Sequence, residues 1–459
     1  MDTYLRRVIT GLLCVVIFGV ALQAPISVWA DIWGGSYALF IKSWKEILLG
    51  VAAILTAVLV YRSGDYQRIV RSRILWLVGA IALVHLIVML GFNHPILSEG
   101  AGLVIDLRNY LAFAIGFILI TLYPRARKPI VYSFLAAMAL VLVFAFLQVT
   151  VLPRDFLAVL GYSIETIAPY QTVDLNDSYI RINSFLRGPN PLGAYAVIGL
   201  AGVLAFAWRQ RDKLRRFSRP DLALTAGGLT LSLVAIWFSY SRSALIATAI
   251  VVLGALIAVS GRRWVVRIIA SSIMLGVVSL VGLFALRDIP FVANVVFHTN
   301  EESTSAVKSD DDHLDSLQDG IESTLESPLG VGIGTAGSPS LLTDSPKIIE
   351  NQYLYIAHES GLIGLLLQIG LLIWVLLVMW RYRRRDWLVL AVGTSGVGLA
   401  VVGLVLPVWV DDTVGLTWWM LAGVALAGVY WKRTKQEQKT KTGNTLNAGK
   451  SDQETAEAA

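Results

Sequence analysis

Arg242 is the residue whose setting says most about chemistry, because it is the only charged residue between Leu222 and Ser260. At about 1.5 Å per helical residue this run is too long for one membrane crossing and fits two, so the chain turns around near residues 239–243. That turn places Arg242 at a membrane face. An arginine near hydrocarbon, which costs roughly 2.5–3.5 kcal/mol at the centre of a membrane helix, is usually kept for a pathway or an anionic ligand. A snorkelling anchor is the alternative.

Two further arginines stand before another helix start. Arg181 and Arg187 precede Pro189, where an apolar segment begins, and Asn190 follows that proline. Proline is common at the first position of a helix, and a helix start attracts anions because its free N–H groups and its dipole point outward. The pattern indicates an anion site; a polar loop with an asparagine cap is the alternative.

Side chains suited to acid–base chemistry gather late in the chain. Glu350, Asn351 and His358 flank the start of an apolar segment, and His313 follows an acidic run within residues 301–312. Partial burial at a membrane surface tunes such groups toward general acid or base function. An interfacial polar role is the alternative for Glu350 and His358.

Several other chemistries are excluded or disfavoured. Residues 332–337 match the dinucleotide fingerprint Gly-x-Gly-x-x-Gly, but no strand precedes them in a βαβ unit. The acidic run lacks the ligand spacing of a calcium loop and fits a solvated segment. Cys14 is the only cysteine, which excludes intramolecular disulfides, zinc sites and thiol catalysis. We expect no metal and no cofactor.

The composition identifies the elements that must position these residues. Of the 459 residues 56% are hydrophobic and 15% are charged, which excludes soluble classes and predicts an all-α polytopic membrane protein. The net charge of +6 reflects arginines beside membrane segments and does not imply nucleic acid. About twelve stretches have spanning length, near residues 8–30, 47–61, 75–93, 109–123, 130–151, 190–208, 222–239, 244–260, 268–287, 360–380, 388–410 and 414–431.

Basic residues cluster in every second connection between these stretches. By the positive-inside rule those connections and both termini are cytoplasmic. The long connections at residues 152–189 and 288–356 are then extracytoplasmic, and the second is a large loop between helices 9 and 10. Within it, residues 314–325 predict a helix and residues 328–334 a tight irregular turn.

The domain organisation that follows is simple. We expect one polytopic membrane domain over residues 1–431 and a disordered cytoplasmic tail over residues 432–459, which is polar and lacks aromatic residues. The first apolar segment also fits a signal peptide ending at Ala30, but its long apolar run favours a retained helix.

Four landmarks, in this order, resemble the O-antigen ligase and polymerase family. They are residues 181–193 with Gly-Pro-Asn before a helix, Ser-Arg-Ser-Ala-Leu at residues 241–245, Ser-Pro-Leu-Gly-Val-Gly at residues 327–332, and Glu350-Asn351 followed by Gly-Leu-Ile-Gly at residues 361–364. Proteins of this family usually have about twelve helices and a large outer loop late in the chain. They transfer or polymerise glycans that arrive outside the membrane on a polyprenyl diphosphate such as undecaprenyl diphosphate, without nucleotide sugars and, in the ligases, without metal.

The resemblance implies that Arg181 and Arg242 bind the diphosphate, and we expect Arg187 to join them. Arginines give fixed charge and bidentate donors to phosphate oxygens, so they can take the place of a metal. Asn190 is implied as a supporting residue beside them.

The resemblance is less regular at the base that must accept a proton from the attacking sugar hydroxyl. Glu350 stands where ligases have a histidine before the asparagine, and His313 stands where many members have an arginine. The glycine-rich turn and Glu-Asn-Gln-Tyr-Leu are more similar to polymerase-type members, so both activities stay open. Glu350 is the first-choice base and His313 the second. Asn351 and His358 are expected to support them.

The favoured function is a metal-independent, inverting glycosyltransferase of the bacterial cell envelope, with both termini inside the cytoplasmic (inner) membrane. Its partners would be a polyprenyl-diphosphate-linked glycan, an acceptor glycan or lipid, and the bilayer. The alternative is a transporter or flippase of lipid-linked glycans, which predicts ionisable residues deep within several helices, whereas here we expect charges only at the outer face. A non-catalytic scaffold role would not explain the presence of Arg242 or of the patterned outer loop.

Overall fold

The chain is an all-α polytopic membrane protein. The computed structural model describes residues 2–173, 176–210, 219–294 and 304–429. In this part of the chain eleven helices are long and apolar enough to cross a membrane, and Trp387–Val402 is a shorter apolar helix. Each of the twelve predicted stretches coincides with one of these helices, so the predicted fold class is confirmed.

The order of elements shows short helices and one hairpin between the long helices. In sequence they are α1 (Asp2–Gly19), η1 (Val20–Leu22), α2 (Gln23–Trp33), η2 (Gly35–Tyr37), α3 (Ala38–Lys42), α4 (Trp44–Ser63), α5 (Tyr66–Val70), α6 (Arg73–Gly91), α7 (Ile96–Leu122), η3 (Pro124–Ala126), α8 (Arg127–Thr150), η4 (Phe156–Leu160), β1 (Gln171–Val173), β2 (Asn176–Arg181), α9 (Pro189–Gln210), α10 (Arg219–Phe238), α11 (Arg242–Val259), α12 (Arg262–Ala285), α13 (Pro290–Val292), α14 (Thr304–Glu326), α15 (Gly337–Ser340), α16 (Gln352–Tyr382) and α17 (Trp387–Val402). The last described helix is Asp412–Val429.

The last helix, Asp412–Val429, is the centre of the bundle. Of its residues 94% are buried, while its mean hydropathy of 1.3 is the lowest of the eleven spans. Trp418 and Trp419 are fully buried, and Trp419 packs edge-on against Tyr110 of α7 at 5.0 Å between ring centroids. A side chain at Gly423 would collide with the Phe113 carbonyl of α7, so glycine allows the two helices to touch. Close backbone approach through small residues is how helices associate in lipid.

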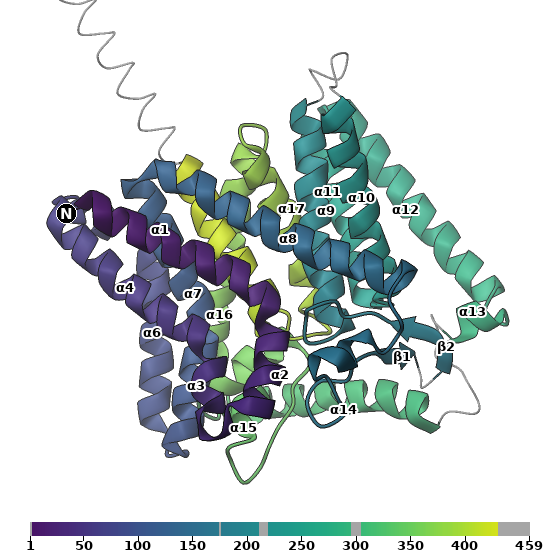
Figure 1. The fold of residues 1–459 in the computed structure, drawn as a ribbon, viewed down its shortest axis with the longest axis horizontal. Helices are drawn as coiled ribbons and strands as arrows, with labels where there is room; N and C mark the ends of the chain where they lie inside the picture. The colour runs from purple at the N-terminus through teal and green to yellow at the C-terminus, as the bar shows by residue number, and fades with distance from the viewer. Residues whose placement is uncertain (1, 174–175, 211–218, 295–303, 430–459) are drawn as a thin grey trace, which may run out of the picture.

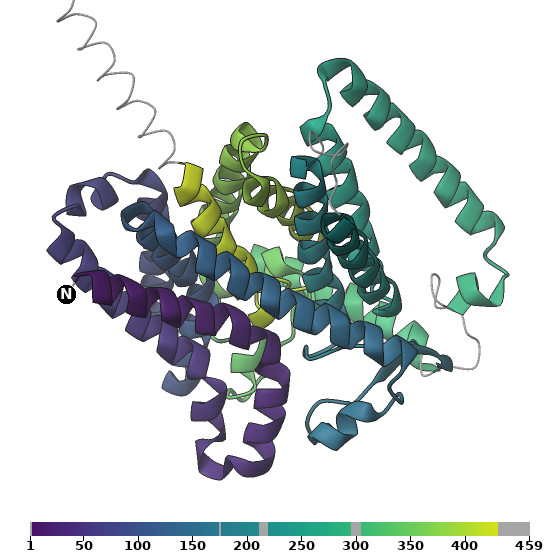
Figure 2. The ribbon, with the colours of Figure 1, turned by 45° about the horizontal axis from the view of Figure 1, so that its top comes forward.

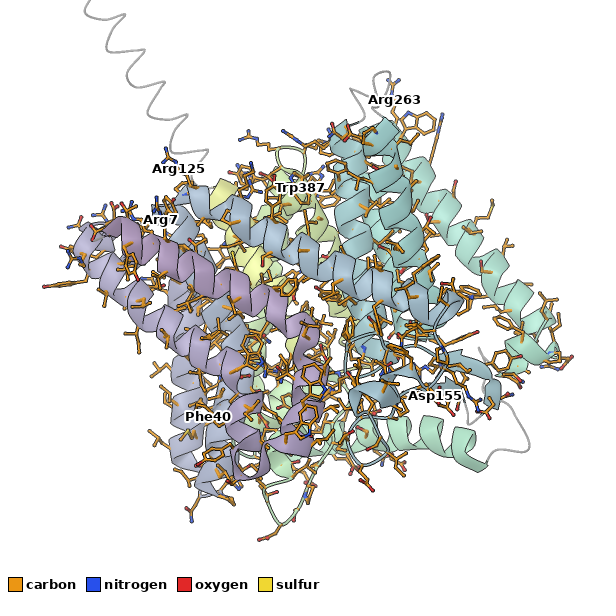
Figure 3. The ribbon with its side chains drawn as sticks, viewed as in Figure 1. Arg7, Phe40, Arg125, Asp155, Arg263 and Trp387 are labelled. Carbon is orange, nitrogen blue, oxygen red and sulfur yellow. The ribbon has the colours of Figure 1, made fainter. Side chains whose placement is uncertain are left out.

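Two opposite faces of the bundle differ in chemistry. Helix α14 and the β1–β2 hairpin lie at one end of the long helices, and we call this end the loop face (Figure 1). Arg7, Arg125 and Arg263 lie at the other end, while Asp155 lies near the loop face (Figure 3). We call the arginine-bearing end the basic face. The predicted helix at residues 314–325 is confirmed as part of α14.

Helix α12 stands apart from the rest of the bundle. It leans away from α10 and α11 (Figure 2), and none of its residues is buried. Its apolar surface therefore meets lipid on nearly all sides, as its mean hydropathy of 2.4 allows.

Three sequence expectations need correction. Helix α7 begins at Ile96, not near residue 109, and α17 ends at Val402, not near residue 410. The connection at residues 152–189 contains a two-stranded antiparallel hairpin, in which Gln171 pairs with Arg181. The expectation that ionisable residues stay out of the helices is also wrong, because His85 and Arg108 are buried within α6 and α7.

Candidate functional site

The first part of the site is where β2 meets the turn between α10 and α11. The Ile182 amide donates to the Phe238 carbonyl oxygen at 3.1 Å, and the Arg181 Nε donates to the Ser239 carbonyl oxygen at 3.0 Å. Arg242 is the first residue of α11 and its side chain is exposed. The structure therefore brings Arg181 next to the turn that carries Arg242, although the two lie in different loops of the sequence.

The start of α9 completes this arginine site. Arg181 Nη2 donates to Asn190 Oδ1 at 2.7 Å, so Asn190 orients the guanidinium. A Cβ at Gly193 would lie 2.6 Å from Ala244 Cβ and 2.9 Å from Ser239 Oγ, so only glycine lets α9 approach the turn. Hydrogen bonds from its guanidinium to the Ser239 carbonyl oxygen and to Asn190 Oδ1 hold Arg181 in one orientation.

An aromatic cluster supports the turn. Tyr240 has a φ of +47°, which is uncommon for a residue with a Cβ and indicates a backbone held by its surroundings. Its ring packs edge-on against Tyr179 of β2 at 6.2 Å, and Tyr179 packs against Phe291 of α13 at 5.9 Å. Burial raises the pKa of the Tyr240 hydroxyl, with Tyr179 adding to the effect, so that hydroxyl stays neutral. The turn is thus braced from both neighbouring loops.

Arg187 lies in a different environment from the other two arginines. Its side chain is exposed, and its charge acts on the carboxyl group of Asp411. Burial raises the pKa of Asp411, while Arg187 lowers it in turn. Asp411 also caps the last helix, accepting from the Thr413 and Val414 amides at 3.0 Å each. The positive charge of Arg187 therefore favours the ionised form of the buried Asp411 carboxyl group.

A buried ion network extends inward from this point, and sequence reasoning missed it. Arg108 of α7 donates to Glu46 Oε1 of α4 at 2.8 Å and forms an ion pair with Asp412. Lys45 lies 3.1 Å from the same Glu46 oxygen and 3.4 Å from Asp412. Buried charges persist in proteins when they are paired in this way, and their removal one at a time is costly. The network joins the start of α4 and the start of the last helix to the middle of α7.

The candidate base Glu350 lies where α14 meets the start of α16. Its side chain is half-buried, and its backbone amide donates to Ser316 Oγ of α14 at 3.1 Å. Asn351 caps α16, with Oδ1 accepting from the Tyr353 and Leu354 amides at 2.9 and 3.0 Å. Its Nδ2 donates to the Leu404 carbonyl oxygen at 2.8 Å. Asn351 thus fixes the backbone on which Glu350 stands.

The second candidate base, His313, lies in α14, one helical turn before Ser316. Its side chain lies outside the described residues. His358 is buried, with Nδ1 2.6 Å from Ser323 Oγ of the same helix. Helix α14 therefore docks along the start of α16 through its serines, and His358 serves that docking.

The glycine-rich turn at residues 328–334 is locked into a kink of α16. Gly361 interrupts the helix with φ +68° and ψ −179°. The Val331 amide donates to the His358 carbonyl oxygen at 2.7 Å, and the Leu362 amide donates to the Pro328 carbonyl oxygen at 2.9 Å. The kink leaves the His358 carbonyl and the Leu362 amide without partners inside the helix, and the glycine-rich turn supplies those partners. This explains why both the turn and the kinked segment contain glycine.

Glu359 holds the same glycine-rich turn through hydrogen bonds, and it lies beside a second carboxyl group, that of Asp106. Its Oε1 accepts from the Gly334 amide at 3.1 Å and the Ala336 amide at 2.9 Å, and its side chain contacts Asp106 of α7. Asp106 lies 3.7 Å from His85 Nε2. Sequence reasoning did not find this cluster, because its members come from three helices. In the described ranges no group of three or more His, Cys, Asp or Glu residues is arranged to hold a metal ion.

The two halves of the site are joined by the segment between α17 and the last helix. The Gln352 amide donates to the Gly403 carbonyl oxygen, and Gln352 Oε1 accepts from the Trp409 amide at 2.8 Å. The same segment continues to Asp411, on which Arg187 acts. The segment thus contacts Gln352, near Glu350, at one end and carries Asp411 at the other. These features define a multi-pass membrane protein whose candidate residues lie at its loop face.

The comparison with known families agrees with this architecture. Residues 227–369 match the family model described as O-antigen ligase, so this part of the chain is similar to that family. The matched segment contains Arg242, the glycine-rich turn and Glu350, while Arg181 lies outside it. The match supports a role in surface polysaccharide assembly. No curated protein matches the chain.

Proposed function

We propose that the chain transfers or polymerises glycan from a polyprenyl-diphosphate carrier onto an acceptor hydroxyl at the loop face. The observation that carries the proposal is the meeting of Arg181 with the turn bearing Arg242. Arg181 lies outside the segment that matches the family model. The fold alone therefore brings its positive charge next to the turn that carries Arg242. Two guanidinium groups at a membrane surface suit a diphosphate whose lipid remains in the bilayer.

The arginines stabilise the leaving group. The acceptor oxygen forms a bond to the anomeric carbon while the bond from that carbon to the phosphate oxygen breaks, and the electron pair leaves with the lipid diphosphate. Arg181 is aimed by Asn190 and the Ser239 carbonyl, and Arg242 stands on the rigid start of α11. Preorganised positive charge where negative charge develops lowers the barrier. Direct displacement inverts the anomeric carbon.

The proton of the acceptor hydroxyl goes to a base on the α14–α16 side, with Glu350 first and His313 second. Asn351 and Ser316 fix the backbone at Glu350, and its half-buried side chain remains reachable. A positioned carboxylate contributes about 10²–10⁴-fold to a rate. Arg187, whose positive charge acts on the Asp411 carboxyl group, is a positioning residue in this mechanism.

The test is reconstituted transfer from a polyprenyl-diphosphate-linked oligosaccharide, measuring glycosidic product and released lipid diphosphate together. Arg181→Ala should lower the rate about 10²–10³-fold, the usual loss when one preorganised donor is removed. Arg154→Ala is the matched control, because Arg154 is an exposed arginine of the same loop that pairs with Asp177 at 3.7 Å. Equal activity of both variants, at equal protein level, would remove Arg181 from the mechanism.

We propose that the loop face is extracytoplasmic and the basic face cytoplasmic in the inner membrane, with both termini inside. Arg7, Arg125 and Arg263 share one end of the bundle (Figure 3), and positive-inside topology places such an end in the cytoplasm. The diphosphate site then faces the compartment where flipped lipid-linked glycans arrive.

A transporter of lipid-linked glycan is the second candidate, and the buried Glu46–Arg108–Asp412 network is the observation that favours it. Ionisable residues within helices often mark transport pathways. The two candidates predict different products from the same liposomes. An enzyme releases lipid diphosphate and forms a new glycosidic bond, whereas a transporter moves intact lipid-linked glycan across the bilayer and forms neither.

A further inference from the structure

An apolar groove runs along the outside of the bundle between α16 and α17. It has a volume of about 280 Å³ and walls that are almost entirely apolar; it is lined by Ile373, Leu376, Leu377, Met379, Trp380, Arg383, Val389, Leu390, Gly393, Thr394 and Val397. From Ile373 to Arg383 the helix rises about 15 Å, which is half of a roughly 30 Å hydrocarbon core. The groove therefore has the length of one leaflet.

The groove ends at a cluster of positive charge on the basic face. Arg383 lines its mouth, and Arg381, Arg384 and Arg385 are beside it on the chain. The one carboxylate in this connection, Asp386, is already held by Arg127 through two hydrogen bonds of 2.8 and 2.6 Å. In the described part of the chain no ion pair joins the four arginines to a carboxylate.

The two arginines nearest the groove are held in place by neutral groups. Arg383 Nε and Arg384 Nε both donate to the Ala258 carbonyl oxygen, at 3.2 and 3.0 Å, at the end of α11. Arg383 also lies 4.2 Å above the Trp380 ring. Backbone carbonyls orient the guanidinium groups without neutralising them. Two like charges held this close, in a partly apolar setting, favour an anion between them.

We propose that this groove binds one anionic glycerophospholipid of the leaflet at the basic face, with its phosphate on Arg383 and Arg384 and an acyl chain along α16 and α17. Basic pockets between membrane helices bind such head groups, and exposed Trp380 fits the interfacial level at which they lie. The groove opens on the face opposite the arginine site of Arg181 and Arg242. It is therefore a separate lipid site, independent of the proposed reaction.

The experiment measures binding of phosphatidylglycerol and phosphatidylcholine to the purified, delipidated full chain by native mass spectrometry. The wild type should bind phosphatidylglycerol more tightly. Arg383→Gln with Arg384→Gln should weaken that binding about tenfold to thirtyfold, the effect of two interfacial charges. The matched control is Arg262→Gln with Arg263→Gln, two exposed arginines on the basic face at the start of α12, which should leave it unchanged.

A second variant keeps both arginines and their hydrogen bonds to α11. Val397→Trp fills the groove at a half-exposed wall residue, so it should weaken phosphatidylglycerol binding while the charge stays the same. Equal affinity of the wild type for both lipids would overturn the proposal. So would an equal loss in the control pair, because the charge of the whole face and not the groove would then select the lipid.

Discussion

Gly361→Ala is the sharpest test of how the glycine-rich turn and α16 hold each other. Gly361 has φ +68° and ψ −179°, a region that is essentially restricted to glycine and costs other residues about 1–3 kcal/mol. Its new Cβ would also collide with the carbonyl group of Leu329, and overpacking of this kind costs about 1–3 kcal/mol. The loss of unfolded-state freedom offsets about 0.4–1 kcal/mol. We expect a net destabilisation of about 1–5 kcal/mol.

The same helix supplies the control. A Cβ at Gly370 of α16 meets no atom within 4 Å, so Gly370→Ala should be neutral or stabilise by up to about 1 kcal/mol. Both variants are compared by equilibrium unfolding in mixed micelles, followed by the fluorescence of the 14 Trp residues. Gly361→Ala should also lose transfer activity, because Glu359 fastens the displaced turn. If the two variants were equally stable, the kink and the turn would not be locked together.

The remaining predictions concern the proposed reaction and its sidedness. Arg242→Lys keeps the charge but loses the planar fork, so it should weaken use of the lipid diphosphate, and Arg242→Ala should do so more severely, by about 10²–10³-fold in transfer rate; full transfer by the alanine variant would make Arg242 an anchor. Glu350→Gln should cost about 10²–10⁴-fold and His313→Ala less, measured with chelator present, and the reverse order would move the base to His313. Reporters fused near Ser305 should be active outside and those near Arg384 inside; the opposite pattern would place the site in the cytoplasm.

Sequence patterns predict the helices well where hydropathy alone decides. The run around Arg242 divides into α10 and α11 with a turn between them, and α9 begins at Pro189 as its proline indicates. Helix α14 is recognisable because its apolar residues recur at helical spacing. These features depend on residues close together in the chain, so one sequence contains enough information to find them.

The errors come from residues whose partners are far away in sequence. The charged residues Glu99, Asp106 and Arg108 lower the local hydropathy, so nearly half of α7, residues 96–108, was not predicted as part of a span. Arg108 is tolerated there because Glu46 and Asp412 neutralise it. Nothing near Arg108 in the sequence identifies those partners.

The candidate site divides in the same way. The arginines were found from local signals, namely an isolated charge and a helix start. The roles of Asn190 and Asn351 were not, because each depends on a partner that the fold supplies, the Arg181 guanidinium and the Leu404 carbonyl oxygen. The contact between Glu359 and Asp106 joins residues of two helices, so only the assembled bundle shows it.

The buried last helix, Asp412–Val429, has a consequence for biosynthesis. It follows every other described helix in the order of translation, yet it occupies their centre, so the bundle cannot close until it arrives. It is the least hydrophobic of the eleven spans, so lipid stabilises it little and contacts with the other helices stabilise it most. Chains that stop before Asp412 would leave Arg108 without this ion-pair partner and the facing surface of α7 uncovered. Closure of the described bundle therefore depends on insertion of its last helix.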